Sequence, residues 1–213
     1  MDRRIIAVEG PIGVGKTSLA TRLADALGHD LMLEQPDDNP FMDRFYENPR
    51  AAALPAQLYF LFQRAKQFEK LKQHDMFQPS FVSDFMIEKD RLFAQATLDT
   101  DEFSLYEQVY ATLTIEAPTP DLVIYLQAPV EVLRERIAKR GRAYEQSISQ
   151  DYLRQVADNY VEFFLAYRMA PLLIVNASEF NPVENDGDFE LLLKQIQRTR
   201  SGIHYFNPVA GDW

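Results

Sequence analysis

A glycine-rich segment near the N-terminus has the residue types and spacing of a phosphate-binding loop. It fits the pattern G-x-x-x-x-G-K-[ST], in which glycines permit a tight turn whose amide hydrogens point at phosphate oxygens. Lys16 would supply a positive charge to the β- and γ-phosphates, and the Thr17 hydroxyl would bind Mg²⁺. The residues predicted to bind ATP are Gly10, Pro11, Ile12, Gly13, Val14, Gly15, Lys16, Thr17 and Ser18.

A second group of candidate residues is basic and lies between positions 134 and 142. Arg136 and Arg140 are four residues apart and share one face of a predicted helix, while Gly141 lets the chain turn so that Arg142 can point inward. Phosphoryl transfer needs such cations because its transition state spreads negative charge over equatorial oxygens. We therefore predict that these arginines and Lys16 are catalytic. The competing interpretation is a solvated basic face that offsets an acidic surface.

Two carboxylates each follow an apolar run. Glu34 closes the second run and Asp84 closes the third. In an open α/β sheet, ligands bind beyond the carboxyl ends of the strands, so both acids should face the phosphates. One could act as a general base on an acceptor hydroxyl, and the other could hold Mg²⁺ together with Thr17. The alternative for either acid is a helix N-cap or a surface charge.

The elements that must position these residues alternate along the chain. Short apolar runs indicate buried parallel strands, and segments whose apolar residues have helical spacing separate them. This order predicts an α/β protein with a five-stranded, doubly wound parallel sheet flanked by helices on both faces, forming one domain over residues 1–213. The predicted strands are 5–8, 31–33, 81–83, 122–126 and 172–175, and the predicted helices are 17–27, 51–73, 85–98, 104–116, 130–140, 149–168 and 189–198. The acidic stretch 179–188 is predicted to be a solvated loop.

Composition narrows the function classes. Hydrophobic residues make up 46% and charged residues 25% of the chain, which are ordinary globular values. The net charge of −10 argues against a sequence-independent nucleic-acid binder, because an acidic field repels a polyanion. Cysteine is absent, so there is no thiolate nucleophile or thiolate metal site. No apolar stretch reaches a membrane span or a secretory signal, and we expect a cytoplasmic protein without a membrane partner.

The sequence resembles the deoxynucleoside kinases, especially the bacterial deoxyadenosine/deoxyguanosine kinase branch. The phosphate loop is shared with many enzymes, whereas the spacing of four further residues is much more specific. The resemblance runs from Ile5 to about Asn176. Its carriers are Glu9 to Thr17, Glu34 with Pro36, Asn39-Pro40-Phe41, Phe45-Tyr46-Glu47-Asn48-Pro49, Gln57, Arg64, and Arg136 to Arg142 followed by Glu145.

The resemblance implies a P-loop kinase fold, a homodimer and a role for each matching residue. Glu34 would accept the proton of the sugar 5'-hydroxyl. Tyr46 and Glu145 would hydrogen-bond the 3'-hydroxyl, and Gln57 would read the base edge as both donor and acceptor. Residues 136–148 would form a lid that carries the arginines. The predicted substrate-binding residues are Glu34, Tyr46, Gln57, Arg64, Asp84, Asp90 and Glu145, of which Arg64 and Asp90 would line the base pocket.

The predicted function is therefore transfer of the ATP γ-phosphate to the 5'-hydroxyl of a deoxynucleoside. Deoxyadenosine and deoxyguanosine are favoured as acceptors, and deoxycytidine is a further candidate. One departure from the family concerns the acid-Arg-Ser triplet of many members, which here reads Asp84-Phe85-Met86. The missing arginine leaves Lys89 or a lid arginine to compensate.

Two other functions compete with this one. A thymidylate-type kinase would phosphorylate a nucleoside monophosphate, and Arg44 or Arg50 would then have to bind the acceptor phosphate. A non-catalytic nucleotide-binding protein would bind ATP without transferring phosphate. That interpretation gives Glu34, Tyr46 and Glu145 no reason to converge.

Overall fold

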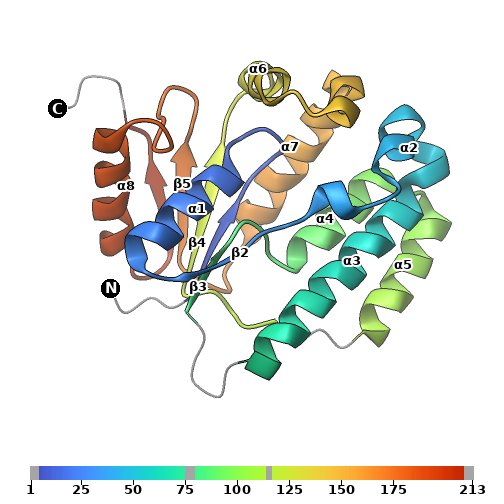
Figure 1. Ribbon diagram of the computed structural model, residues 1–213, viewed down its shortest axis with the longest axis horizontal. Coiled ribbons are helices and arrows are strands. Elements are labelled where there is room, and N and C mark those ends of the chain that lie inside the picture. The colour runs from blue at the N-terminus through green and yellow to red at the C-terminus, as the bar shows by residue number, and fades with distance from the viewer. Residues whose placement is uncertain (1–4, 75–79, 114–116, 209–213) are drawn as a thin grey trace.

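A parallel sheet forms the centre of the protein in the computed structural model (Figure 1). The sheet has six strands. The structure describes residues 5–74, 80–113 and 117–208, without the side chains of 72–74. The strands lie in the order β2-β3-β1-β4-β5-β6. Their bounds are β1 (Ile5–Glu9), β2 (Asp30–Met32), β3 (Phe81–Ser83), β4 (Leu122–Gln127), β5 (Leu172–Asn176) and β6 (Ile203–Phe206). In the register, Ala7 is paired with Ser83 on one side and Val123 on the other.

The parallel α/β fold is confirmed, but the predicted number of five strands is wrong. The sixth strand, β6, pairs in parallel with β5 and forms an edge of the sheet. Its side chains are half-buried or exposed, with Tyr205 68% exposed. A search for wholly apolar runs finds strands buried on both faces and misses an edge strand of this kind.

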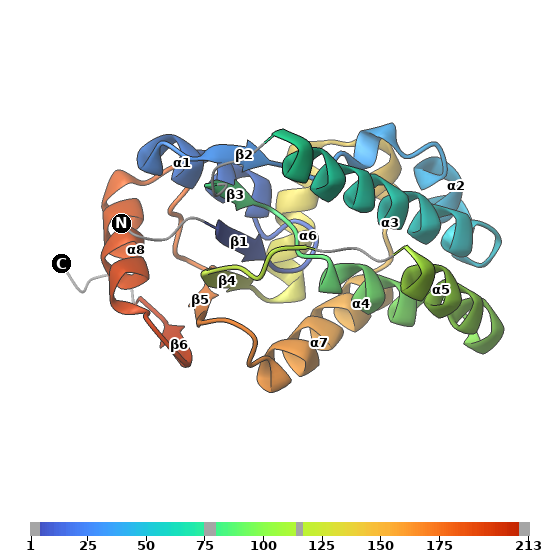
Figure 2. The same ribbon diagram turned by 90° about the horizontal axis from the view of Figure 1, so that it is seen from below.

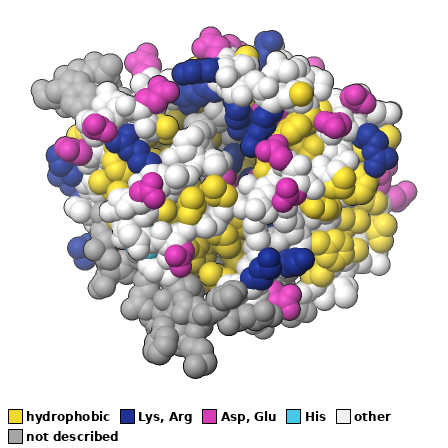
Figure 3. Space-filling view, in the orientation of Figure 1, with side chains coloured by type: hydrophobic (Ala, Val, Ile, Leu, Met, Phe, Trp, Pro, Cys, Tyr) yellow, Lys and Arg dark blue, Asp and Glu magenta, His cyan; other side chains and the backbone are white. Residues whose placement is uncertain are grey.

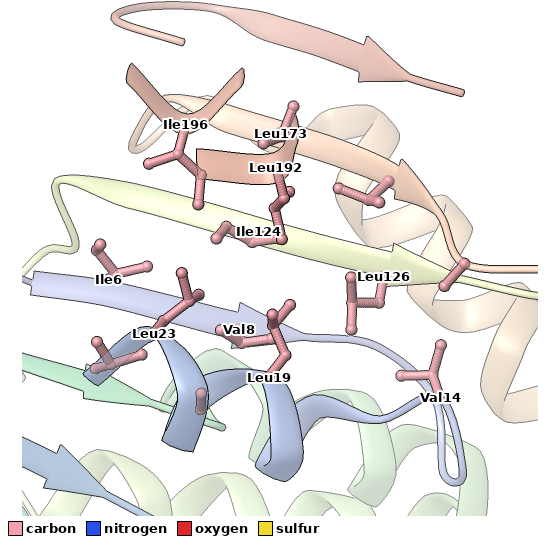
Figure 4. Packing of buried hydrophobic residues seen from close by; sticks show 14 of the residues in the cluster. Ile6, Val8, Val14, Leu19, Leu23, Ile124, Leu126, Leu173, Leu192 and Ile196 are labelled. Atoms are coloured by element: carbon pink, nitrogen blue, oxygen red, sulfur yellow. The ribbon is translucent and has the colours of Figure 1, made fainter. Parts of the chain in front are cut away.

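Two pairs of helices cover the faces of the sheet. The helices α1 (Lys16–Leu27) and α8 (Asp186–Arg198) pack on one face, and Figure 4 shows their leucine and isoleucine side chains directed at strand residues such as Val8 and Ile124. On the other face, α4 (Glu88–Thr97) and α7 (Gln150–Ala166) surround Tyr125 and Ile174. Figure 2 shows the two pairs on opposite sides of the strands.

The remaining helices extend beyond the sheet and enclose a site at its carboxyl edge. The long helix α3 (Pro49–His74) packs against α2 (Met42–Glu47), α4 and α5 (Thr100–Thr112). On the other side of the edge, α6 (Val130–Arg140) leads into the 3₁₀ helix η2 (Ala143–Ser147). A second 3₁₀ helix, η1 (Pro36–Asp38), follows β2. Among the described residues, no helix is both long and apolar enough to cross a membrane.

Helix positions were well predicted and helix ends less so. The segment 85–98 becomes helical only at Glu88, because Phe85 and Met86 belong to a buried turn. The predicted end of the segment 104–116 lies outside the described residues. The stretch 179–188 is not wholly a solvated loop: Asn185 caps α8, and the buried Asp188 accepts a hydrogen bond from the Asn181 N–H at 2.8 Å. Acidic residues at this position favour a helix because they face the positive end of its dipole.

At Gly13, the phosphate loop packs so closely against α6 that there is no room for a side chain. Gly13 has a φ of 84°, and an added Cβ would lie 2.7 Å from the Leu133 carbonyl oxygen and 2.8 Å from Ile137 Cγ1. Both neighbours belong to α6, so this glycine sets how closely the loop approaches the helix that carries the arginines.

We predict that Gly13→Ala destabilises the protein by about 2–5 kcal/mol, because backbone strain and steric overlap add. The matched control is Gly202→Ala, where φ is 71° and an added Cβ meets nothing within 4 Å. The control should lose only about 1–2 kcal/mol. Urea unfolding measures both values, and equal losses would contradict the packing argument.

Candidate active site

The predicted residues converge on a cavity at the carboxyl edge of the sheet. Figure 3 shows Lys and Arg side chains around a hollow in the upper middle of one face. The cavity encloses about 880 Å³, counting its opening to solvent. Its lining includes Lys16, Thr17, Glu34, Tyr46, Gln57, Arg64, Asp84, Arg140, Arg142 and Glu145. It therefore contains most of the predicted site.

The phosphate loop occupies the floor of this region. Gly15 has a φ of 105° and directly precedes α1, so the loop ends at the N-terminus of this helix. The Lys16 Nζ atom donates to the carbonyl oxygens of Gly10 at 2.7 Å and Pro11 at 3.1 Å. Backbone amides, a helix N-terminus and a lysine together suit a polyphosphate.

Asp84 links the loop to the segment after β2. Its Oδ2 atom accepts a hydrogen bond from the Thr17 hydroxyl at 2.6 Å, and its Oδ1 atom accepts one from the Glu34 N–H at 2.8 Å. A hydroxyl and a carboxylate at this separation fit Mg²⁺, which takes oxygen ligands and usually binds through one or two carboxylates plus phosphates and waters. The side-chain chemistry is thus compatible with the predicted metal pair.

The Glu34 carboxylate is held by two cations. Arg64 from α3 contacts Oε1, and the Lys89 Nζ atom from α4 lies 2.8 Å from Oε2. Burial favours the neutral acid, but Lys89 and Arg64 outweigh it and hold the pKa of Glu34 below its usual range. The side chain is therefore an ionised carboxylate at neutral pH.

Arg64 also reaches a second acid behind Glu34. Its Nη1 atom lies 2.5 Å from Asp90 Oδ2, and the side chains of both residues are almost wholly buried. Burial raises the pKa of Asp90, although Arg64 opposes that shift. The guanidinium also lies 5.3 Å from the centre of the Phe60 ring, which lines the cavity. Arg64 thus lines the cavity, and the buried Asp90 lies behind it as a second partner of its charge.

Phe85 stands where the acid-Arg-Ser triplet has its arginine, and Lys89 is one of the residues expected to compensate for it. Phe85 is buried against Phe68 in the core beneath α3. Lys89, four residues later, lines the cavity with its side chain 4% exposed. The structure therefore places a cation from the first turn of α4 beside Glu34. It brings no lid arginine to this position.

The residues predicted to bind a sugar and a base line the same cavity. Tyr46 stacks on Tyr144 with ring centres 5.8 Å apart and planes 4° from parallel. Glu145 is buried and receives two hydrogen bonds from Arg140, at 2.6 and 2.9 Å. The Gln57 Nε2 atom donates to Thr97 at 3.4 Å, whereas its buried Oε1 atom meets no donor among the described residues. That oxygen is a free acceptor at the cavity wall.

The three lid arginines do not gather at one point. Arg140 and Arg142 line the cavity, and Arg142 also lies 3.2 Å from Asp37 in η1. Arg136 instead donates to the backbone oxygens of Val14 at 3.2 Å and Ala177 at 2.7 Å. It therefore supports the rear of the phosphate loop.

Arg136 lines a second cavity that sequence reasoning missed. This space lies on the other side of the phosphate loop, between α6 and the loop after β5, and encloses about 1,090 Å³ including open solvent. Its further lining includes Lys139, Ala177, Phe180, Asn181, Pro182, Val183 and Glu184. Part of its lining belongs to the stretch 179–188, which was predicted to be a solvated loop because of its acidic composition. Phe180 in that stretch is in fact buried.

Glu9 is a further functional candidate, one of the residues that carry the resemblance but to which no role was assigned. It ends β1 fully buried, accepting hydrogen bonds from the N–H of Met86 at 2.7 Å and of Gly10 at 3.2 Å. The Tyr160 hydroxyl donates to it at 2.9 Å. Burial raises the pKa of Glu9, against the lowering effect of Lys89 and Lys16. Glu9 therefore connects the phosphate loop to the turn after β3. In the sequence, the charged residue at the end of an apolar strand could have indicated this role.

The fold and the site together define a P-loop phosphotransferase. A phosphate loop at a helix N-terminus adjoins a cavity that holds an ionised carboxylate. The model of the deoxynucleoside kinase family matches residues 6–200. The chain belongs to the deoxynucleoside kinase family.

Individual relatives agree with this assignment. The chain is 35% identical over 198 residues to a deoxyguanosine kinase from Bacillus subtilis, covering 90% of this chain and 95% of the relative. It is 29% identical to a deoxyadenosine/deoxycytidine kinase from the same organism, covering 90% and 91%. The solved structure of deoxyadenosine kinase from M. mycoides with dCMP and dCDP bound is similar, with a TM-score of 0.79, 25% identity, and coverage of 91% and 99%.

We predict that binding of a nucleoside triphosphate weakens as pH rises through about 8. Burial and the nearby Lys89 lower the pKa of Lys16 to about 8, so above that pH the free protein loses the charge that faces the phosphates. If only the protonated form binds, KM for ATP should be about tenfold higher at pH 9 than at pH 7.

The neutral substrate provides the control for this prediction. KM for a deoxynucleoside should change much less over the same pH range, because that ligand carries no phosphate for Lys16 to bind. A KM for ATP that stays flat from pH 7 to 9 would contradict the assignment of the pH effect to Lys16.

Proposed function

We propose that this kinase transfers the γ-phosphoryl group of ATP to the 5'-hydroxyl of a deoxynucleoside, with purine deoxynucleosides favoured and deoxycytidine as a further substrate. The relatives are named as kinases of deoxyguanosine, deoxyadenosine and deoxycytidine, which supports this range of substrates. The observation that carries the proposal is the ionised Glu34 carboxylate in the same cavity as Lys16 and Thr17. A proton acceptor and a phosphate-binding loop thus face one enclosed space.

The proposed phosphoryl transfer forms one bond to the γ-phosphorus and breaks another. The 5'-oxygen attacks the γ-phosphorus as its proton passes to Glu34, and the bond from the γ-phosphorus to the bridging oxygen breaks in line. ADP leaves with the electron pair of that bond. Lys16 and the lid arginines Arg140 and Arg142 stabilise the charge on the transferred group. Lys89 beside Glu34 takes the place of the missing arginine as a cation near the 5'-oxygen.

The acceptor would lie with its sugar toward the lid and its base toward α3. Tyr46 and Glu145 would bind the 3'-hydroxyl, and the free Gln57 oxygen would accept from the base edge. Arg64 and Asp90 would set the polarity at the end of the base pocket. Aromatic residues on the lining, among them Phe60 and Phe93, offer faces on which a base can stack.

The donor would extend from the phosphate loop into the second cavity. Phe180 and Pro182 give that space an apolar wall suited to the base of ATP. Mg²⁺ would be held by Thr17 and Asp84, which are already within hydrogen-bond distance of each other. When bound, the metal neutralises charge on the transferring phosphates.

The monophosphate-kinase alternative is less well supported by the geometry. It needs a cation at the acceptor phosphate, and Arg44 and Arg50 were the candidates. Both side chains are exposed, Arg44 lies over the Phe41 ring, and neither belongs to the cavity lining. A neutral acceptor alcohol fits the site better.

Several finer expectations remain predictions. A homodimer joined through helices is one, with the long helix predicted over 51–73 as a candidate. Val161 and Leu165, exposed and one turn apart on α7, are further candidate contacts. The single domain over residues 1–213, closure of the lid at about 136–148 and a cytoplasmic location are the others.

A substrate panel tests the proposed function. With ATP and Mg²⁺, deoxyadenosine and deoxyguanosine should give higher kcat/KM than thymidine. A 2',3'-dideoxynucleoside should be a poorer substrate, because each hydrogen bond lost at the 3'-position is worth roughly 0.5–1.5 kcal/mol. Preference for a deoxynucleoside monophosphate would instead support the thymidylate-type function, and ATP binding without any transfer would support a non-catalytic protein.

We predict that Glu34→Gln lowers kcat by about 10²–10⁴, because the amide cannot accept the proton of the 5'-hydroxyl. The matched control is Glu107→Gln, since Glu107 also forms a two-contact ion pair, with Arg91, at 2.6 and 2.8 Å on the surface. The control should retain turnover. Wild-type turnover in Glu34→Gln would remove Glu34 from the role of base.

A further inference from the structure

Glu34 lies on backbone that belongs to no regular element. Residues 33–35 form a strap between the last residue of β2 and the start of η1. The Gln35 carbonyl accepts the first hydrogen bond of η1, from the Asp38 N–H at 3.2 Å, whereas Leu33 and Glu34 lie outside both elements. A general base must nevertheless be held close to its productive position, and a misplacement of about 1 Å can cost about 100-fold in rate. The contacts that fix the strap therefore bear on catalysis.

Two glutamines of α3 bind the strap on both sides of Glu34. The Gln67 Nε2 atom donates to the Leu33 carbonyl at 3.0 Å, and the Gln63 Nε2 atom donates to the Gln35 carbonyl at 3.2 Å. The two residues are four apart, so they project from the same face of the helix. With the Glu34 N–H bound to Asp84, the backbone is held at three consecutive residues.

The same helix also holds the Glu34 side chain. Arg64 lies between the two glutamines in sequence and contacts Glu34 Oε1. The buried Oε1 atoms of Gln63 and Gln67 meet no donor in the described part of the chain. Both half-buried amides hydrogen-bond the strap through their nitrogen atoms. Helix α3 therefore contacts the Glu34 side chain and the backbone on both sides of it.

We propose that Gln63 and Gln67 are positioning residues for phosphoryl transfer, acting through the backbone on either side of Glu34. This inference rests on the proposed role of Glu34 as the base. It assigns α3 a second task beside lining the acceptor cavity: keeping the carboxylate at a fixed distance from the phosphate loop.

The experiment is a double-mutant cycle on folded protein. Gln67→Met and Gln63→Met keep the side-chain length and remove the donor. Each should lower kcat about tenfold while KM for ATP and for deoxyadenosine stays within about twofold, the pattern of an interaction needed in the transition state. Gln108→Met is the control, since the Gln108 Nε2 atom donates to the Ser104 carbonyl within α5, and its kcat should be unchanged.

The second arm combines each change with Glu34→Gln. If the glutamines act through Glu34, Gln67→Met should change kcat less than about twofold in that background, because interacting residues are not additive. An equal loss in both backgrounds, or no loss in the single variants, would overturn the proposal. Should Gln67→Met fail to fold, Gln63→Met, nearer the surface, completes the same cycle. Wild-type turnover of Glu34→Gln would instead overturn the role of Glu34 itself, so the two failures are distinguishable.

Discussion

The charge balance around Glu34 is the constraint on which the rest of the site depends. Glu34, Arg64, Lys89 and Asp90 come from a strap and two helices and meet in a region largely closed to water. Removing one partner would leave a buried charge uncompensated, which typically costs about 3–5 kcal/mol. The positions of α3 and α4 relative to the sheet are therefore coupled to the ionisation of one carboxylate. The two cations thus keep the Glu34 carboxylate ionised in surroundings that would otherwise favour the neutral acid.

The sequence was informative wherever a pattern is local. The phosphate loop, the buried strands and most helices repeat over a few residues, and the fold class follows from their order. Edge strand β6 escaped because its half-exposed residues do not form an apolar run. The partners of Glu34 also escaped: Arg64 is 30 residues away and Lys89 is 55 residues away, and no local spacing encodes such contacts. The convergence of Tyr46, Gln57 and Glu145 was reached through family resemblance, not through periodicity.

Phe85 and Lys89 show how a cation can be supplied from a different place in the chain. A residue directly after Asp84 sits in a tight turn, where the Phe85 ring is directed into the core beneath α3. The first turn of α4 brings Lys89 back to the cavity four residues later. A lysine is a compact charge on a flexible stem, whereas an arginine offers a planar fork of donors. The cation that reaches Glu34 from α4 is therefore a point charge, while Phe85 contributes to the core.

The lid arginines carry anionic partners before any phosphate reaches them. Arg140 is paired with Glu145, and Arg142 lies between Glu145 and Asp37. In the proposed function, a triphosphate would compete with these carboxylates for the arginines, so the gain in free energy would be the difference between two ion pairs. Glu145 lines the same cavity, and an arginine that turned toward the phosphates would leave this acid available to a sugar hydroxyl. Binding of the phosphate donor and of the acceptor would then be linked through one carboxylate of η2.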